Sequence, residues 1–272
     1  MIGFPPATCR RLVIKVGSAL LVAPDGSVRR AWLDSLVTEI AERRAAGQEI
    51  AVVSSGAIAL SRVWADLLVA HGLTAAQMLV TLGDLEDRRR YLNASATLDR
   101  LIGLGAVPVV NENDSVATEE IRFGDNDRLA ARIGQAARAD AVVLLSDIDG
   151  LYTANPQSHP DATLIPLVEK IDARIAAMAD GKSASGMGSG GMISKLEAAR
   201  IATGAGTHLA IISGRVNAPL GHWQETGRGT LFHASARRGA RKDWLAGRLT
   251  VKGHITVDAG AAEALRKGRS LL

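Results

Sequence analysis

The chain has 272 residues, of which 47% are hydrophobic, 22% are charged and 3% are aromatic. This composition excludes a disordered or collagen-like chain, and the scarcity of aromatic residues favours an aliphatic core typical of a parallel α/β protein. The single cysteine, Cys9, excludes an internal disulfide and a cysteine-based zinc site and fits a reducing compartment. Because no apolar run is long enough to span a membrane and the start is not ordered like a signal peptide, we expect a soluble, cytoplasmic protein with no membrane partner.

The net charge of +4 is mild, but basic residues are concentrated near the C-terminus. Such a cluster permits a polyanionic partner, and a solvated linker is the alternative interpretation. The cluster consists of Arg237, Arg238, Arg241, Lys242, Arg248 and Lys252.

Short β-branched apolar runs alternate with helical patterns along the chain. Apolar spacing marks two of the helices, one from Leu33 to Ile40 that stops before Gly47 and one from Leu129 to Ala137. Strands that alternate with helices predict right-handed βαβ units, and therefore an α/β fold in which a mostly parallel sheet is covered on both faces. Ligands of such sheets bind at the carboxyl ends of the strands, so the residues that follow each strand are the candidates for function. The expected strands are 12–16, 50–54, 77–81, 107–110, 141–145 and 209–212.

The first two expected strands end in residues suited to an anion. Lys15 lies inside an apolar strand, where burial is costly unless the ammonium meets a negative charge, and Gly17 follows it, so that backbone amides can approach an anion. The alternative is a lysine that reaches solvent from an edge strand. The second strand leaves into 54–56, Ser-Ser-Gly, which predicts an anion or carboxylate site, with a plain helix N-cap as the alternative.

Two polar clusters follow the fourth strand, at 111–114 (Asn-Glu-Asn-Asp) and at 124–128 (Gly-Asp-Asn-Asp-Arg). Their carboxylates and amides can hold a substrate ammonium group, a Mg²⁺ ion or catalytic lysines. Turn chemistry explains any one of these residues, but it explains the two clusters together poorly.

The last candidates are Ser146 and Asp147, which leave the fifth strand, and a glycine-rich run over 186–191. Lys195 follows that run in the first turn of a predicted helix. In this layout backbone N–H groups wrap phosphates while the ammonium neutralises transferring charge. The run is neither a Walker A loop nor a dinucleotide-binding fingerprint, because no strand feeds the first pattern and the second belongs to a first strand–helix turn.

These motifs resemble the amino acid kinase family over nearly the whole chain, and within it the glutamate 5-kinase branch. The resemblance implies a three-layer αβα sandwich with a mostly parallel central sheet. Segments 84–94 and 111–127 are the ones that indicate the branch. The matching residues are 15–18, 53–59, 84–94, 108–114, 123–127, 146–147 with 150–153, and 190–192 with 195.

The resemblance implies ATP-dependent phosphorylation of the γ-carboxylate of L-glutamate to L-glutamyl 5-phosphate, the first step of proline biosynthesis. Lys15 and Lys195 are then the catalytic cations and Asp127 holds them in register. Mg²⁺ bridges the ATP phosphates, and no protein side chain is expected to bind the metal directly. Proline as a feedback inhibitor and a homodimer or homotetramer are implied in the same way. The implied substrate-binding residues are Ser55, Gly56, Asp114 and Asn126, with Asp114 as partner of the α-ammonium; the implied ATP-binding residues are Lys15, Gly17, Ser146, Asp147, Ser189, Gly190, Gly191, Met192 and Lys195.

Two other functions are compatible with parts of the sequence. A family member that phosphorylates acetylglutamate, aspartate, carbamate or a nucleotide would keep the lysines and the glycine loop, but it would not need 111–114 together with 124–127 as they stand. A non-catalytic RNA-binding or regulatory protein on a kinase scaffold is the third possibility. Intact Lys15, Asp127 and Lys195 argue against it, since buried charges are costly to keep without a charge to neutralise.

The resemblance divides the chain into a kinase domain over 1–235 and a region over 236–272 that contains a linker and the opening of a small β-rich, PUA-like domain. The residues that resemble this module are 242–245, 255–261 and 268–272. Because only the opening of the module is present, RNA binding is not expected.

Family members place roughly 25–30 residues between the Ser-Gly-Ala-Ile-Ala motif and the helix that here contains Trp64, a length typical of a helix or lid. Here Leu60 follows Ala59 at once. Either the protein lacks this segment or the sequence is incomplete at this point, and we favour the second alternative because intact motifs resume on both sides. If the segment is lost, the glutamate pocket lacks a wall.

Overall fold

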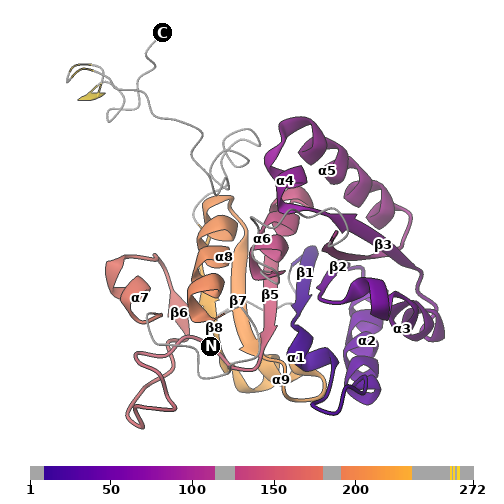
Figure 1. The fold of residues 1–272 in the computed structure, drawn as a ribbon, viewed down its shortest axis with the longest axis horizontal. Helices are drawn as coiled ribbons and strands as arrows, with labels where there is room; N and C mark the ends of the chain where they lie inside the picture. The colour runs from indigo at the N-terminus through magenta and orange to yellow at the C-terminus, as the bar shows by residue number, and fades with distance from the viewer. Residues whose placement is uncertain are drawn as a thin grey trace.

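The strands of the computed structural model form one eight-stranded sheet in the order β3-β4-β2-β1-β5-β7-β8-β6 (Figure 1). Residues 9–113, 126–179 and 191–234 are described, together with positions 258, 260, 262 and 263. Neighbouring strands are parallel except β7 and β8, which are antiparallel. The strands are β1 (Arg11–Val16), β2 (Glu49–Ser54), β3 (Ala75–Val80), β4 (Val107–Glu112), β5 (Ala141–Ser146), β6 (Leu167–Val168), β7 (His208–Ser213) and β8 (Gly229–Phe232).

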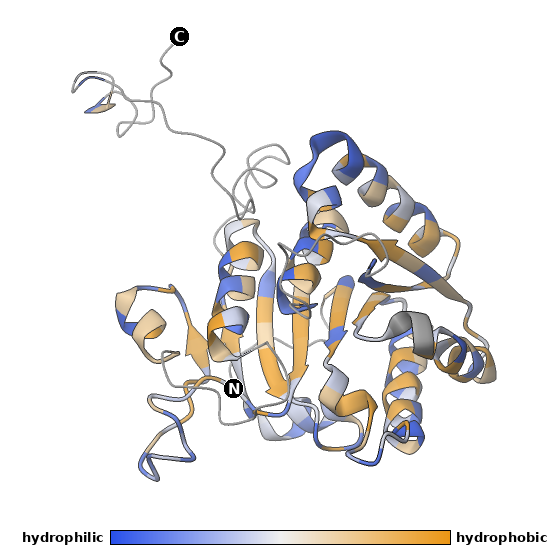
Figure 2. Cartoon of the chain, in the orientation of Figure 1, coloured by the Kyte–Doolittle hydropathy of each residue, from blue (hydrophilic) through white to orange (hydrophobic). Residues whose placement is uncertain are grey.

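Helices cover both faces of the sheet, and the strand alternation decides which side chains meet which helices. Val13 belongs to the core shared with α5, α6 and α8, whereas Leu12 and Ile14 belong to the core shared with α2, α3 and α9. Figure 2 shows apolar strands between helices whose outer faces are polar. The helices are α1 (Ser18–Leu21), α2 (Arg30–Ala45), α3 (Ala57–Ala70), α4 (Leu82–Glu86), α5 (Arg88–Gly103), α6 (Asn126–Ala136), α7 (Ala173–Ala177), α8 (Met192–Gly204) and α9 (Pro219–Thr226). The expected three-layer αβα fold is confirmed.

The six expected strands are confirmed as β1 to β5 and β7, and both helices marked by apolar spacing are confirmed as α2 and α6. The short strands β6 and β8 were not expected. Within the described residues no helix is long and apolar enough to cross a membrane. The expected PUA-like region over 236–272 lies outside the described residues apart from four positions, so the boundary at 235 stays a prediction.

Helix α6 is the most deeply placed helix described, with almost every side chain buried. Gly134 lets it approach β5 closely, because a Cβ atom at this position would lie 2.5 Å from Val142 Cγ2. The helix ends in a Schellman motif: Arg138 takes a φ of +52°, and the Ala139 N–H donates to the Gly134 carbonyl at 2.8 Å. The N-terminus of α6 therefore has a fixed place above the carboxyl edge of the sheet.

A short connection joins β2 to the regular helix α3. The chain passes through Gly56, whose φ of +64° favours glycine, directly into α3, which continues to Ala70. The fully buried Trp64 donates from Nε1 to Ser54 Oγ at 3.0 Å and ties α3 to the end of β2. In the described residues β2 therefore leads into α3 through Ser55 and Gly56 alone, and whether the protein lacks the longer segment stays a prediction.

Candidate active site

Asp127 holds two lysine side chains at the carboxyl edge of the sheet. Its Oδ1 atom lies 2.6 Å from Lys15 Nζ, and its Oδ2 atom lies 3.0 Å from Lys195 Nζ. The three residues come from β1, from the first turn of α6 and from the first turn of α8, and all three side chains are buried. One carboxylate thus fixes two ammonium groups from three separate elements.

Burial alone would raise the pKa of Asp127, but the charges of Lys15 and Lys195 and their hydrogen bonds outweigh that effect and lower the pKa below its usual value. The carboxylate is therefore ionised at neutral pH. The three groups together carry one net positive charge, so the cluster remains attractive to an anion. This arrangement excludes the alternative interpretation of Lys15, because β1 lies between β2 and β5 and is not an edge strand.

A second polar cluster joins the ends of β2 and β4 to the start of α6. Asn126 donates from Nδ2 to Ser55 Oγ at 2.7 Å and to Asn111 Oδ1 at 3.4 Å. Since these two contacts fix the orientation of the amide, Asn126 Oδ1 faces away from both acceptors, and this buried oxygen accepts no hydrogen bond from the described residues. The N-cap interpretation of Ser55 is wrong: Gly56 is the N-cap of α3 and no side chain caps it.

The remaining expected residues line the same edge. A Cβ atom at Gly17 would lie 3.5 Å from Lys15 Nζ, so the glycine leaves space beside the ammonium. After β5, Ser146 donates from Oγ to Asp147 Oδ1 at 3.1 Å. Gly191 is the N-cap of α8, and Met192 is its first residue. The expected residues Asp114, Ser189 and Gly190 lie outside the described part of the chain.

An ion pair that the sequence analysis did not expect lies beside the lysine cluster. Arg128 of α6 forms an ion pair with Glu197 of α8, one residue after Asp127 and two after Lys195. No sequence pattern marks this pair, because each partner looks like an ordinary charged position on a helix surface. Among the described residues no group of three His, Cys, Asp or Glu side chains is arranged to hold a metal ion.

Comparison with known proteins shows the family of the chain. The sequence model of the amino acid kinase family matches residues 56–213. A glutamate 5-kinase of Sphingopyxis alaskensis is 60% identical over 99% of this chain and 80% of its own length, and one of Zymomonas mobilis is 56% identical over 99% and 75%. The chain belongs to the glutamate 5-kinase branch of the amino acid kinase family.

Two solved structures share the kinase fold. An isopentenyl phosphate kinase superposes with a TM-score of 0.53 at 18% identity, covering 82% of this chain and 99% of its own. The UMP kinase of Ureaplasma parvum gives a TM-score of 0.57 at 14% identity, covering 82% and 98%. The match to the S. alaskensis glutamate 5-kinase runs over 298 positions although this chain has 272 residues, so that relative has positions which this chain lacks.

Proposed function

We propose that the protein transfers the γ-phosphoryl group of ATP to the γ-carboxylate of L-glutamate and so produces L-glutamyl 5-phosphate, the first step of proline biosynthesis. The observation that carries this proposal is the pair of buried lysines held by Asp127 at the strand ends. The identity of 50–60% to proteins named glutamate 5-kinase supports the choice of glutamate over acetylglutamate, aspartate or carbamate.

In the transfer step, an oxygen of the γ-carboxylate forms a bond to the γ-phosphorus while the bond from that phosphorus to the bridging oxygen of ADP breaks. The carboxylate is already ionised at neutral pH, so the reaction needs no general base. What the protein must supply is position and positive charge. The ammonium groups of Lys15 and Lys195 stabilise the negative charge on the equatorial oxygens of the transferring phosphoryl group. Asp127 keeps both ammonium groups in place without neutralising the cluster.

Glutamate is expected to bind beside α6. The buried Asn126 Oδ1 is an acceptor suited to the substrate α-ammonium, and Asp114 is the carboxylate expected to share that ammonium. Ser55, held by Asn126, and the backbone of Gly56 approach the carboxylates of the substrate.

ATP is expected to enter as its magnesium complex on the other side of the lysines. Gly17, Ser146, Asp147, Gly191 and Met192 lie at the strand ends and helix start where the proposal places ATP, and Ser189 and Gly190 belong to the same glycine-rich run. The same proposal includes a cytoplasmic location, feedback inhibition by proline and a homodimeric or homotetrameric assembly.

The test incubates the purified protein with ATP, Mg²⁺ and one candidate carboxylate at a time and traps the acyl phosphate as a hydroxamate. We expect hydroxamate with glutamate and little with acetylglutamate or aspartate. Asp114→Ala should raise the KM for glutamate far more than the KM for ATP. Hydroxamate with acetylglutamate or aspartate but none with glutamate contradicts the proposed substrate.

A further inference from the structure

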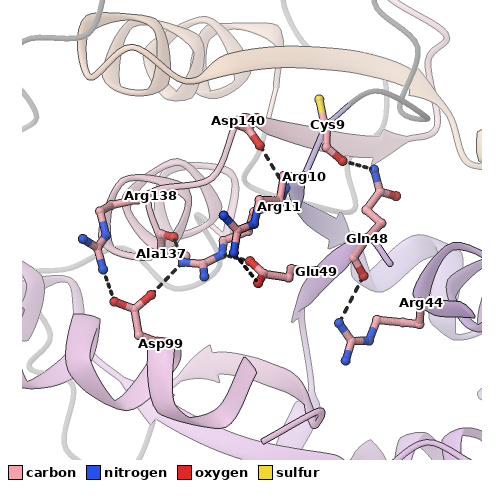
Figure 3. A network of polar contacts seen from close by, with 10 residues as sticks. All are labelled: Cys9, Arg10, Arg11, Arg44, Gln48, Glu49, Asp99, Ala137, Arg138 and Asp140. Carbon is pink, nitrogen blue, oxygen red and sulfur yellow. Dashed lines mark hydrogen bonds and ion pairs between the residues drawn. The ribbon is translucent and has the colours of Figure 1, made fainter. Parts of the chain in front are cut away.

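A network of polar contacts at the amino-terminal ends of β1 and β2 holds the C-terminal end of α6 (Figure 3). Arg11, the first residue of β1, donates from Nε to Glu49 Oε2 at 2.7 Å and from Nη1 to Asp99 Oδ1 at 2.7 Å. The same Nη1 also donates to the backbone carbonyl of Ala137, directly after the last residue of α6. The Arg11 side chain is 15% exposed, so water competes little for these contacts.

Arg11 contacts α6 at the end where a cation is most useful. The last carbonyls of a helix lack intrahelical partners and carry the negative end of the helix dipole. Ser95 Oγ donates to the Ala136 carbonyl at 2.6 Å, and Arg11 Nη1 donates to the carbonyl of the next residue, Ala137. Burial would lower the pKa of Arg11, but Glu49 and Asp99 outweigh that effect and raise it, so the guanidinium stays charged.

The strand and the helix are therefore joined at both ends. Arg11 and Lys15 project from the same face of β1, four residues apart, which corresponds to about 13 Å along a strand. Asp127 lies in the first turn of α6 and Ala137 directly follows its last residue, a separation of ten residues that corresponds to about 15 Å along a helix. Since the two lengths nearly match, the contact of Arg11 with Ala137 sets how far α6 can slide along β1.

We propose that Arg11 is a positioning residue for phosphoryl transfer, which fixes α6 against β1 and thereby places the Asp127 carboxylate between Lys15 and Lys195. The inference rests on the proposed function, because it concerns how that site is held. Misplacement of a reacting group by about 1 Å can cost two orders of magnitude in rate, so a register shift of α6 is enough to matter.

The test compares Arg11→Met with Arg10→Met in the hydroxamate assay. Arg10→Met is a matched control, because it removes the same charge from the preceding residue. Arg10 also contacts Glu49, at 3.5 Å, but its side chain is 82% exposed. For Arg11→Met we expect kcat to fall about ten-fold while both KM values change less than about three-fold. Arg10→Met should keep kcat within about two-fold, and Arg11→Lys should recover part of the loss because it retains the cation.

A double-mutant cycle with Asp127→Asn separates positioning from loss of folded protein. If Arg11 acts through Asp127, Arg11→Met should lower kcat little further in the Asp127→Asn background. Equal loss in both backgrounds, or equal behaviour of the Arg11 and Arg10 variants, overturns the inference. If Arg11→Met does not fold, Asp99→Asn and Arg11→Lys replace it in the same cycle. Absence of glutamate phosphorylation by the unsubstituted protein would instead contradict the proposed function.

Discussion

Loss of Lys195 should affect catalysis far more than folding. Lys195→Ala should lower kcat by at least about 10², because it removes one of two charges that stabilise the transferring phosphoryl group. The fold should persist, since Asp127 keeps its contact with Lys15 at 2.6 Å and is not left as an unpaired buried charge. The measurement is kcat by hydroxamate trapping together with thermal unfolding.

Lys170 is exposed and is not one of the site residues, so Lys170→Ala is the control for loss of a lysine. It should leave kcat unchanged within experimental error. Near-normal turnover by Lys195→Ala contradicts the catalytic role of Lys195.

The sequence predicts the members of the lysine cluster but not the contacts that hold the surrounding elements in place. Lys15, Asp127 and Lys195 can be found because each stands next to a predicted strand end or helix start, where ligands of parallel sheets bind. Arg11 cannot be distinguished from Arg10 in the sequence, because only the packing of α6 decides which of the two is buried. The orientation of the Asn126 amide likewise depends on Ser55 and Asn111, which come from distant segments.

Among the elements, α6 connects most of the features of the site. Its first turn carries Asn126 and Asp127, its middle lies against β5, and its last carbonyls receive side chains from α5 and β1. Gly134 is the residue that permits the close approach to β5. The side chain it faces, Val142, is fully buried and stiff at χ1, so it cannot move aside easily.

Gly134→Ala should therefore destabilise the protein, although alanine favours a helix by about 1 kcal/mol over glycine. Overpacking of a core typically costs about 1–3 kcal/mol, so the net loss should be on the order of 1 kcal/mol, and kcat should fall because α6 moves as a unit. Urea unfolding and the hydroxamate assay measure the two effects.

Gly103→Ala is the matched control, because Gly103 ends α5 and a Cβ atom there meets nothing within 4 Å. That variant should be neutral or slightly more stable. A Gly134→Ala protein as stable as the Gly103→Ala protein contradicts the packing argument.

The strands that the sequence did not predict are short. β6 has two residues and β8 has four, and runs of this length do not produce a distinct alternation. β8 also depends on tertiary structure, since it pairs with β7 on one side and with β6 on the other. The long apolar strands β1, β2 and β5 are predictable because their residues are buried on both faces of the sheet, apart from the first residue of β1 and of β2.

For the whole molecule, the order of the strands explains why the site residues meet. β1 lies at the centre of the sheet, so residues at the ends of β2 and β4 lie on one side of Lys15 and residues after β5 lie on the other. The sequence predicts that these segments share one edge, but it does not give the strand order. The distances within the site therefore come from the structure alone.

Charge is distributed so that acid should weaken the fold as a whole. Burial would raise the pKa values of Asp84, Asp127 and Asp149, but contacts with hydrogen-bond donors and cations lower all three. A folded-state pKa below the unfolded value of about 3.9 contributes stability that is fully present above the unfolded pKa and is lost as pH falls through the folded pKa. Glu39 acts in the opposite direction, because its burial, which exceeds the effect of the Gly221 and Leu220 N–H groups, raises its pKa.

Because carboxylates with a lowered pKa outnumber Glu39, the free energy of unfolding should be lower at pH 3 than at pH 7. Asp149→Asn isolates one contribution, since Asp149 receives Arg228 Nε at 2.5 Å and the Tyr152 hydroxyl at 2.8 Å. The Arg228 side chain is 61% exposed, so solvent screens the pair and the difference should be at most about 1 kcal/mol. Urea unfolding at both pH values should show a smaller acid-induced loss for Asp149→Asn than for the unsubstituted protein. The exposed Asp161→Asn serves as the control, and a pH dependence of Asp149→Asn equal to that of Asp161→Asn contradicts the assignment.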